Sequence, residues 1–251
     1  MSALAVTRLE LRRLFVRPLA WVLGALTLAW LAWNFTLLLG SFLAAQIRLA
    51  ALPYGPGYTD LVAVPLLAQL AQLAFLVVPL LSMSALAGER REGRLELLLG
   101  MGLAPTRIVL GKYAALLAWL LAWLALTLAM PLALAHATSI DWGKLAAATL
   151  GVALLLAALA ALGLVCSAFA SHPALAAAAA LVITLGLWAV NLGAQMAGVD
   201  DGALNWLAMS SHLQPMLRGL VASPDVTWFA LLATVCLALA ARRVAAERER
   251  N

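Results

Sequence analysis

Long apolar runs alternate with short charged segments along almost the whole chain. Six such runs can be marked, at Leu19–Ala44, Leu61–Leu86, Ile108–Ala135, Leu145–Ala170, Pro173–Gln195 and Thr227–Ala241. About 20 apolar residues in a helix cross the hydrocarbon core of a bilayer, and every run except the last reaches that length. The last needs Val226 and residues 244–246 to complete it. The pattern therefore predicts an all-α membrane protein with six transmembrane helices.

Composition agrees with this prediction and narrows it. Hydrophobic residues make up 65% of the chain and charged residues 11%, and the mean hydropathy is +1.01. Almost every residue is thus committed to the bilayer, so we expect residues 1–251 to form a single membrane domain. The first apolar run exceeds the roughly 7–15 residues of a signal-peptide core, which makes it an anchor. The net charge of +5 reflects arginines that flank the spans, and no folded basic surface for nucleic acid is indicated.

The basic residues lie mostly on one side of the predicted membrane. Thirteen of the 16 Lys and Arg residues fall in the two termini and between the second and third spans, up to the first turn of the third: Arg8, Arg12, Arg13, Arg17, Arg90, Arg91, Arg94, Arg107, Lys112, Arg242, Arg243, Arg248 and Arg250. The other side holds only Arg48, Lys144 and Arg218. Because Lys and Arg are retained in the cytoplasm, both termini are expected there, in a bacterial inner membrane.

The segment before the first span has the pattern of an amphipathic helix. In Thr7–Arg17, apolar residues gather near one helical face with arginines alongside, and Pro18 then breaks the helix. We expect an interfacial helix that presents Arg8, Arg12, Arg13, Phe15 and Arg17 to headgroups or a partner. A plain basic flank that only fixes the topology is an equal alternative.

Two features inside the spans concern packing and a transport path. The fourth and fifth spans are crowded with Ala and Gly, which allow close helix contact, so these spans are expected to form an interior surface. Gln69 and Gln72 share a helical face, and together with Asn191 they could line a path for a substrate. Hydrogen bonds between helices explain the same residues.

Outside the spans, Trp206–Val221 predicts one or two short external helices interrupted at Pro215, or a segment that dips back into the membrane.

Residues for catalysis, metal binding or ion coupling are not recognisable. Cys166 and Cys236 sit in apolar runs without metal-ligand spacing, and His136, His172 and His212 fall in predicted loops as chance surface residues. Ion-coupled transporters usually need an ionisable residue deep in a span, and none is expected here. We therefore expect no enzyme activity, no metal and no cofactor in this chain. Any transport must draw its energy from elsewhere.

The most informative charged segment is Gly88–Pro105, with the sequence GERREGRLELLLGMGLAP. Read as one helix, it places Glu89, Glu92 and Glu96 on one face. Three like charges on a face repel, so that face needs cations, either from the arginines of the N-terminal segment or from a docked protein. Gly100, Gly102 and Pro105 are expected to end the helix before the third span. A solvated charged loop is the alternative.

This segment resembles the one that permeases of the ABC type-2 family carry between their second and third spans. The likeness rests on GERREGRLELLLGMGLAPTRIVLGKY, where Gly93–Glu96 stands for the family core, with Arg94 where Thr is commoner, and Ile108–Lys112 stands for the start of the next helix. Leu9–Trp21 resembles the amphipathic lead-in of the family. Ser210–Phe229 resembles an external motif of gliding-motility-associated (GldF-like) permeases, with the permeases of nitrous-oxide-reductase maturation (NosY-like) as close relatives.

The resemblance implies a permease subunit of an ATP-binding-cassette exporter. Two permease chains, identical or related, would assemble with two copies of a separate ATPase that binds ATP and Mg. The coupling helix that meets the ATPase would consist of Glu89, Arg90, Arg91, Glu92, Arg94, Leu95, Glu96, Leu98 and Leu99. The chain itself lacks the GxxxxGK[ST] phosphate loop, because position 106 before Gly111-Lys112 is Thr. The alternative is a non-transporting membrane subunit that transmits ATPase motion to a periplasmic protein, or a scaffold.

Overall fold

The computed structural model describes residues 3–16, 18–50, 55–100, 103–196 and 202–248, and their regular structure is entirely helical. In chain order the elements are α1 (Ala3–Val16), α2 (Pro18–Ala50), η1 (Thr59–Ala63), α3 (Val64–Ser82), α4 (Ala87–Arg91), α5 (Arg94–Gly100), α6 (Pro105–Leu132), α7 (Trp142–Phe169), α8 (Pro173–Met196), α9 (Gly202–Leu207), α10 (Met209–Leu217) and α11 (Ser223–Arg248).

Six stretches of helix in the described residues are long and apolar enough to cross a membrane. They correspond to α2, η1 with α3 and α4, α6, α7, α8 and α11. The predicted all-α fold with six membrane-spanning helices is therefore confirmed. The last span is longer than its apolar run, because α11 starts at Ser223 and continues through its basic end to Arg248.

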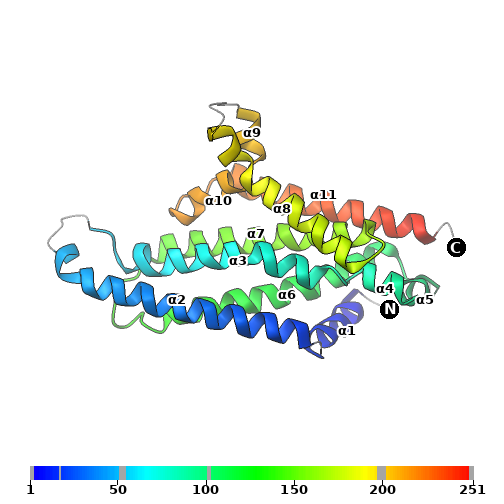
Figure 1. Cartoon of the computed structure of the whole chain (residues 1–251), viewed down its shortest axis with the longest axis horizontal. Coiled ribbons are helices and arrows are strands. Elements are labelled where there is room, and N and C mark those ends of the chain that lie inside the picture. The colour runs from blue at the N-terminus through cyan, green and yellow to red at the C-terminus, as the bar shows by residue number, and fades with distance from the viewer. Residues whose placement is uncertain (1–2, 17, 51–54, 101–102, 197–201, 249–251) are drawn as a thin grey trace.

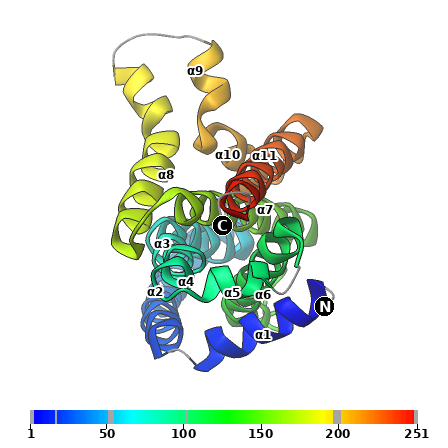
Figure 2. The same cartoon turned by 90° about the vertical axis from the view of Figure 1, so that its right-hand side faces the viewer.

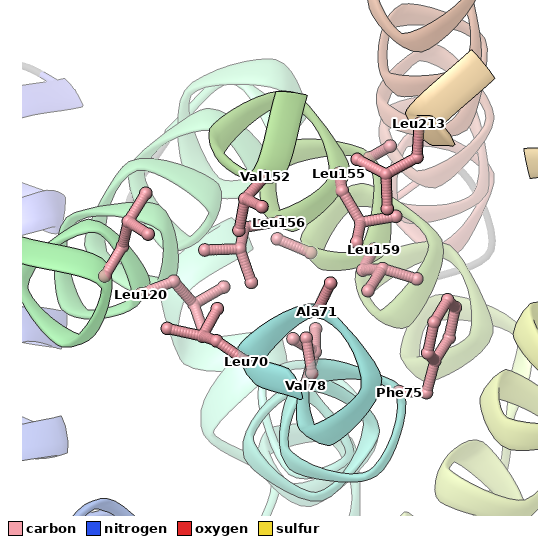
Figure 3. Close-up of a cluster of buried hydrophobic side chains, with 14 of the residues drawn as sticks. Leu70, Ala71, Phe75, Val78, Leu120, Val152, Leu155, Leu156, Leu159 and Leu213 are labelled. Atoms are coloured by element: carbon pink, nitrogen blue, oxygen red, sulfur yellow. The ribbon is translucent and has the colours of Figure 1, made fainter. Parts of the chain in front are cut away.

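The fourth span, α7, forms the centre of the bundle. It packs against α3, α6, α8, α10 and α11, and Figure 3 shows its leucines meeting those of α3, α6 and α10. Small residues permit this contact: a Cβ on Gly163 would lie 2.7 Å from the Ser82 Cβ of α3. The predicted interior packing surface is found along α7, but in α8 the buried residues, among the described side chains, are only Ala176, Ala177, Ala180 and Thr184.

The short helices gather at the two ends of the bundle. Figure 1 shows α1, α4, α5 and the last turns of α11 at one end, which we call the α4 end. Figure 2 shows α1 lying across that end, and α8 and α11 diverging on the other side of α7. The expected break before the first span is present, since α1 ends at Val16 and α2 begins at Pro18.

The external segment forms two short helices, with a break that differs from the predicted one. α9 and α10 meet at Ala208, and Pro215 lies inside α10.

The expectation that His212 is a chance surface residue is wrong. His212 is buried in α10, where Nδ1 lies 2.8 Å from Asp225 Oδ1 and Nε2 lies 2.9 Å from the Trp206 carbonyl oxygen. His136 and His172 are exposed, as expected.

Candidate functional site

The charged segment after the second span forms two short helices where the sequence predicted one. α4 ends at Arg91 and α5 begins at Arg94. Between them Gly93 takes φ 70°, a left-handed conformation that glycine adopts at little cost. Its N–H donates to the Arg90 carbonyl, at 3.1 Å. The prediction of a continuous coupling helix over Glu89–Leu99 is thus wrong, because this glycine turns the chain and separates the faces of the two halves.

Four charged side chains, two of them buried and two partly buried, form a cluster at the α4 end, which we call the charge cluster. Arg13 Nη1 lies 2.7 Å from Glu89 Oε1 and 3.0 Å from Glu10 Oε1. Lys112 Nζ lies 3.0 Å from Glu10 Oε1 and 2.8 Å from Glu89 Oε2. The last contact is an ion pair without hydrogen-bond geometry. The charge cluster therefore joins α1, α4 and α6 through alternating charges.

Because two of its side chains are buried, the charge cluster tolerates the loss of a charged partner poorly. The Lys112 and Glu89 side chains are only 2% and 3% exposed. Two cations and two carboxylates balance, so no net charge is left in a region of low dielectric constant. The sequence suggested that the N-terminal arginines could supply a partner to the glutamates, and Arg13 does so for Glu89. Lys112 was placed among topology-setting flanks, whereas it is a buried partner of two glutamates.

Arg90 connects α4 to the end of α7 and to α11. Its Nη1 donates to the Ala170 carbonyl and its Nη2 to the Ala168 carbonyl, both at 2.6 Å. Nη2 also lies 2.5 Å from Glu247 Oε1 of α11. The carbonyls at the end of a helix have no partner within the helix, so Arg90 caps α7 while it binds α11.

Ser167 of α7 anchors the chain just before α4. Its Oγ accepts from the Leu86 and Ala87 amides, each at 3.0 Å, and donates to the Met83 carbonyl at 3.0 Å. Leu86 and Ala87 are buried here, and these bonds satisfy backbone groups that have no partner in a continuous helix. α4 is thus held by α1 and α6 on one side and by α7 and α11 on the other.

Exposed side chains lie at the end of α4, in the turn after it and on α5. Arg91 and Glu92 are exposed, Leu97 is 70% exposed, and Arg94 is half-buried in an ion pair with Glu92. Leu95 points inward and is buried. Of the predicted coupling residues, the side chains of Glu96, Leu98 and Leu99 lie outside the described part of the structure. We call Arg91, Glu92, Arg94 and Leu97 the docking face.

The interfacial residues of α1 divide in the same way. Arg13 enters the charge cluster, while Arg8, Arg12 and Phe15 remain exposed, and Arg17 lies outside the described residues. Phe15 packs edge-to-face on Trp21, with ring centroids 5.8 Å apart. α1 is thus a packed helix rather than a loose basic flank.

Of the predicted path residues, the structure describes the side chains of Gln69 and Gln72, which differ in exposure. Gln69 is half-buried in α3, and its Oε1 has no hydrogen-bond donor in the described residues. Gln72 is exposed, and the Asn191 side chain falls outside the described part. Whether a substrate passes them stays a prediction.

Sequence reasoning missed Glu10, Ser167, Glu247 and Leu97. Lys112 gave a usable signal, because a lysine a full turn inside an apolar helix requires a buried partner. Ser167 and Glu247 gave none, since their partners lie about 80 and 157 residues away along the chain.

Comparison with known proteins identifies one family. The family model described as ABC-2 family transporter protein matches residues 55–242, about three quarters of the chain. The match starts just before η1 and runs through α4 and α5 into α11. No curated protein matches the chain.

Proposed function

Because the chain belongs to the ABC-2 family of transporter proteins, we propose that it is the permease subunit of an ATP-driven exporter and receives a separate ATPase at the α4 end. One observation carries this proposal. The docking face spans the end of α4, the turn after it and α5, and it directly follows Glu89 and Arg90, which are held by four other helices.

The contacts of Glu89 and Arg90 would pass a displacement of α4 on to the membrane spans. Glu89 joins α4 to α1 and α6, and Arg90 joins it to α7 and α11. A push on Leu97 and its neighbours would therefore move a short rigid element with contacts to three membrane spans and to the helix across their ends. Packed helices shift as units rather than deform continuously. This division also separates the predicted coupling residues by role, with the docking face outside and Glu89, Arg90 and Leu95 inside.

The partner's chemistry follows from the docking face. Leu97 offers an apolar contact, Arg94 lies three residues before it on α5, and Arg91 and Glu92 are exposed just before that helix. An exposed leucine framed by charges is typical of a protein–protein contact with a small apolar centre and a polar rim. ATP and Mg would be bound by the ATPase, and this chain would supply no catalytic group.

Further parts of the proposal concern assembly and placement. We propose two permease chains with two ATPases, because small residues such as Ala174 and Ala178 on α8 remain exposed and suit close helix contact. We also propose that the α4 end faces the cytoplasm of a bacterium and that the protein lies in its inner membrane, which the excess of Lys and Arg at that end supports. The GldF-like branch is proposed on the likeness of Ser210–Phe229.

One observation favours the alternative of a force-transmitting subunit with a periplasmic partner. None of the described α9 residues is buried, and Trp206 and Leu207 are exposed there. An apolar contact at that end would suit an external protein. A chain that only transmits force would stimulate its partner without moving any solute in sealed vesicles.

Affinity purification with a Leu97→Glu variant tests the docking face. The tagged protein is isolated from native membranes, and the co-purified ATPase is quantified by mass spectrometry. A buried charge without a partner strongly opposes association, so we expect a loss of about tenfold or more. Leu220→Glu is the matched control, since Leu220 is 66% exposed at the other end of the bundle. Normal ATPase yield with Leu97→Glu would remove the docking face from the proposal.

A further inference from the structure

Both ring nitrogens of His212 face hydrogen-bond acceptors. Nδ1 lies 2.8 Å from Asp225 Oδ1, and Nε2 lies 2.9 Å from the Trp206 carbonyl oxygen. A carbonyl oxygen only accepts, and so does an ionised carboxylate, whereas a neutral imidazole has a single N–H to donate. Both hydrogen bonds therefore form only when the pair of His212 and Asp225 holds one proton more than a neutral ring and a carboxylate do.

Loss of that proton would act on one of the two hydrogen bonds. His212 and Asp225 are 7% and 8% exposed, so water does not easily replace a missing partner. The neutral ring would keep its one N–H for Asp225, because a charged acceptor makes the stronger hydrogen bond. Nε2 would then turn a lone pair toward the Trp206 carbonyl oxygen. The bond from α10 to α9 would be replaced by a repulsive contact.

The aromatic neighbours of the ring favour its charged form. The His212 ring stacks on Trp228 of α11, with centroids 4.8 Å apart and an angle of 24° between the planes. The Trp206 ring meets it edge-on, with centroids 6.5 Å apart. A cation over an aromatic face is attracted by the π electrons, so the stack on Trp228 adds to the attraction of Asp225.

Few other charges belong to the helices that pack on α10. α8 and α9 contain no charged residue, and Asp225 is the only charged residue of α11 before its basic end. α7 has only Lys144, which is paired with Asp60. The remaining charged residues of the adjoining connections are exposed or lie outside the described part of the chain: Asp141, Asp200, Asp201 and Arg218. Asp225 is thus the charged group in contact with the ring.

α10 is packed into the bundle, whereas α9 is not. A Cβ on Gly151 of α7 would lie only 2.8 Å from Met216 Cβ of α10, and none of the described α9 residues is buried. Ser211 of α10 also donates to Asn205 of α9, at 2.9 Å, but this hydrogen bond is exposed, and water competes with it. Loss of the bond to the Trp206 carbonyl would therefore free α9 while α10 stays in place.

We propose that His212 and Asp225 form a proton-binding latch, which holds α9 against α10 and α11 while the proton is bound and releases α9 when it is lost. Histidine suits this role because its charge changes between about pH 5 and 8. Figure 2 shows α9 and α10 between α8 and α11, so release of α9 would loosen the connection between the last two spans. The latch is independent of the export proposal, which concerns the α4 end.

The mobility of a spin label on α9 tests the latch in the purified full chain in lipid nanodiscs. In a background with Cys166→Ala and Cys236→Ala, a nitroxide is attached at Leu207→Cys, an exposed position of α9. Electron paramagnetic resonance spectra are compared at about pH 5 and about pH 8. We expect the ratio of immobile to mobile label to fall about fivefold at the higher pH, the factor that one net hydrogen bond contributes. A label at Leu231→Cys, exposed on α11, should not respond.

Histidine variants assign the response. His212→Gln keeps an amide donor but cannot take up a proton, so the dependence on pH should disappear. His136→Gln with His172→Gln is the matched control, since both of these histidines are exposed, and it should respond as the wild type does. A label on α9 that is equally mobile at both pH values, or a response that survives His212→Gln, would overturn the proposal.

The matched control also decides the matter if His212→Gln fails to fold. The chain has three histidines, so His212 is the last one left in the variant with His136→Gln and His172→Gln. A response that persists there supports the latch. A response that vanishes there belongs to the exposed histidines and overturns it.

Discussion

The Lys112 ammonium of α6 lies 2.8 Å from the Glu89 carboxylate of α4, and both side chains are almost completely buried. Between them, Glu89 and its neighbour Arg90 connect α4 to α1, α6, α7 and α11. A short helix with one exposed extension and four internal attachments is suited to pass motion into a membrane bundle.

Neutralising Lys112 should destabilise the protein strongly. Lys112→Met retains most of the side-chain volume but leaves Glu10 and Glu89 with a single cation, Arg13. Breaking a buried ion pair from one side typically costs about 3–5 kcal/mol. Unfolding in SDS, followed by tryptophan fluorescence, measures the change in the free energy of unfolding.

The double variant Lys112→Met with Glu89→Gln provides the control for coupling. It removes one charge of each sign and leaves the Arg13–Glu10 pair. The double variant should lose clearly less free energy of unfolding than the two single variants together, because the effects of paired groups are not additive. Simple additivity would show that the two charges do not stabilise each other.

Ser167→Ala should weaken the anchor of α4. The change leaves the Leu86 and Ala87 amides without their acceptor, and a buried unsatisfied group costs about 1–3 kcal/mol. Hydrogen exchange of the backbone amides at Leu86–Arg91 should be faster in the Ser167→Ala variant. Ser41→Ala is the matched control, since that exposed hydroxyl only donates to the Leu38 carbonyl of its own helix. If exchange near α4 is unchanged, Ser167 is not an anchor.

The contact between α3 and α7 can be tested by a paired change. Gly163→Ala would bring a methyl group 2.7 Å from Ser82 Cβ, and overpacking of this kind costs about 1–3 kcal/mol. Adding Ser82→Gly removes the opposing side chain and should restore much of the thermal stability. Gly40→Ala, with no atom near its new Cβ, should be tolerated. A Gly163→Ala protein as stable as wild type would contradict this helix packing.

Cysteine labelling tests the orientation of the bundle. In a background with Cys166→Ala and Cys236→Ala, single cysteines replace the exposed residues Glu92 and Trp206. A membrane-impermeant maleimide applied to intact spheroplasts should label Trp206→Cys and spare Glu92→Cys until the membrane is opened. Labelling of both from outside would contradict the proposed placement of the α4 end.

The long helices could be predicted because apolar length is a local property of the chain. The charge cluster could be predicted only in part: repulsion among the glutamates indicated a need for cations, but not that Arg13 and Lys112 would share Glu89. The turn at Gly93 was missed because helical periodicity continues across it. His212 was misjudged since its partner, Asp225, belongs to the next helix. Local patterns contain no information about such distant pairs.

We propose that the helices of this protein are moved by a separate ATPase subunit. The most direct measurement is ATP hydrolysis by the purified chain alone and by the chain with its co-purified partner, in the same nanodiscs. We expect no hydrolysis by the chain alone, hydrolysis by the complex, and loss of the complex's activity with Leu97→Glu. ATP hydrolysis by the isolated chain, or isolation from native membranes with no ATPase ever bound, would contradict it.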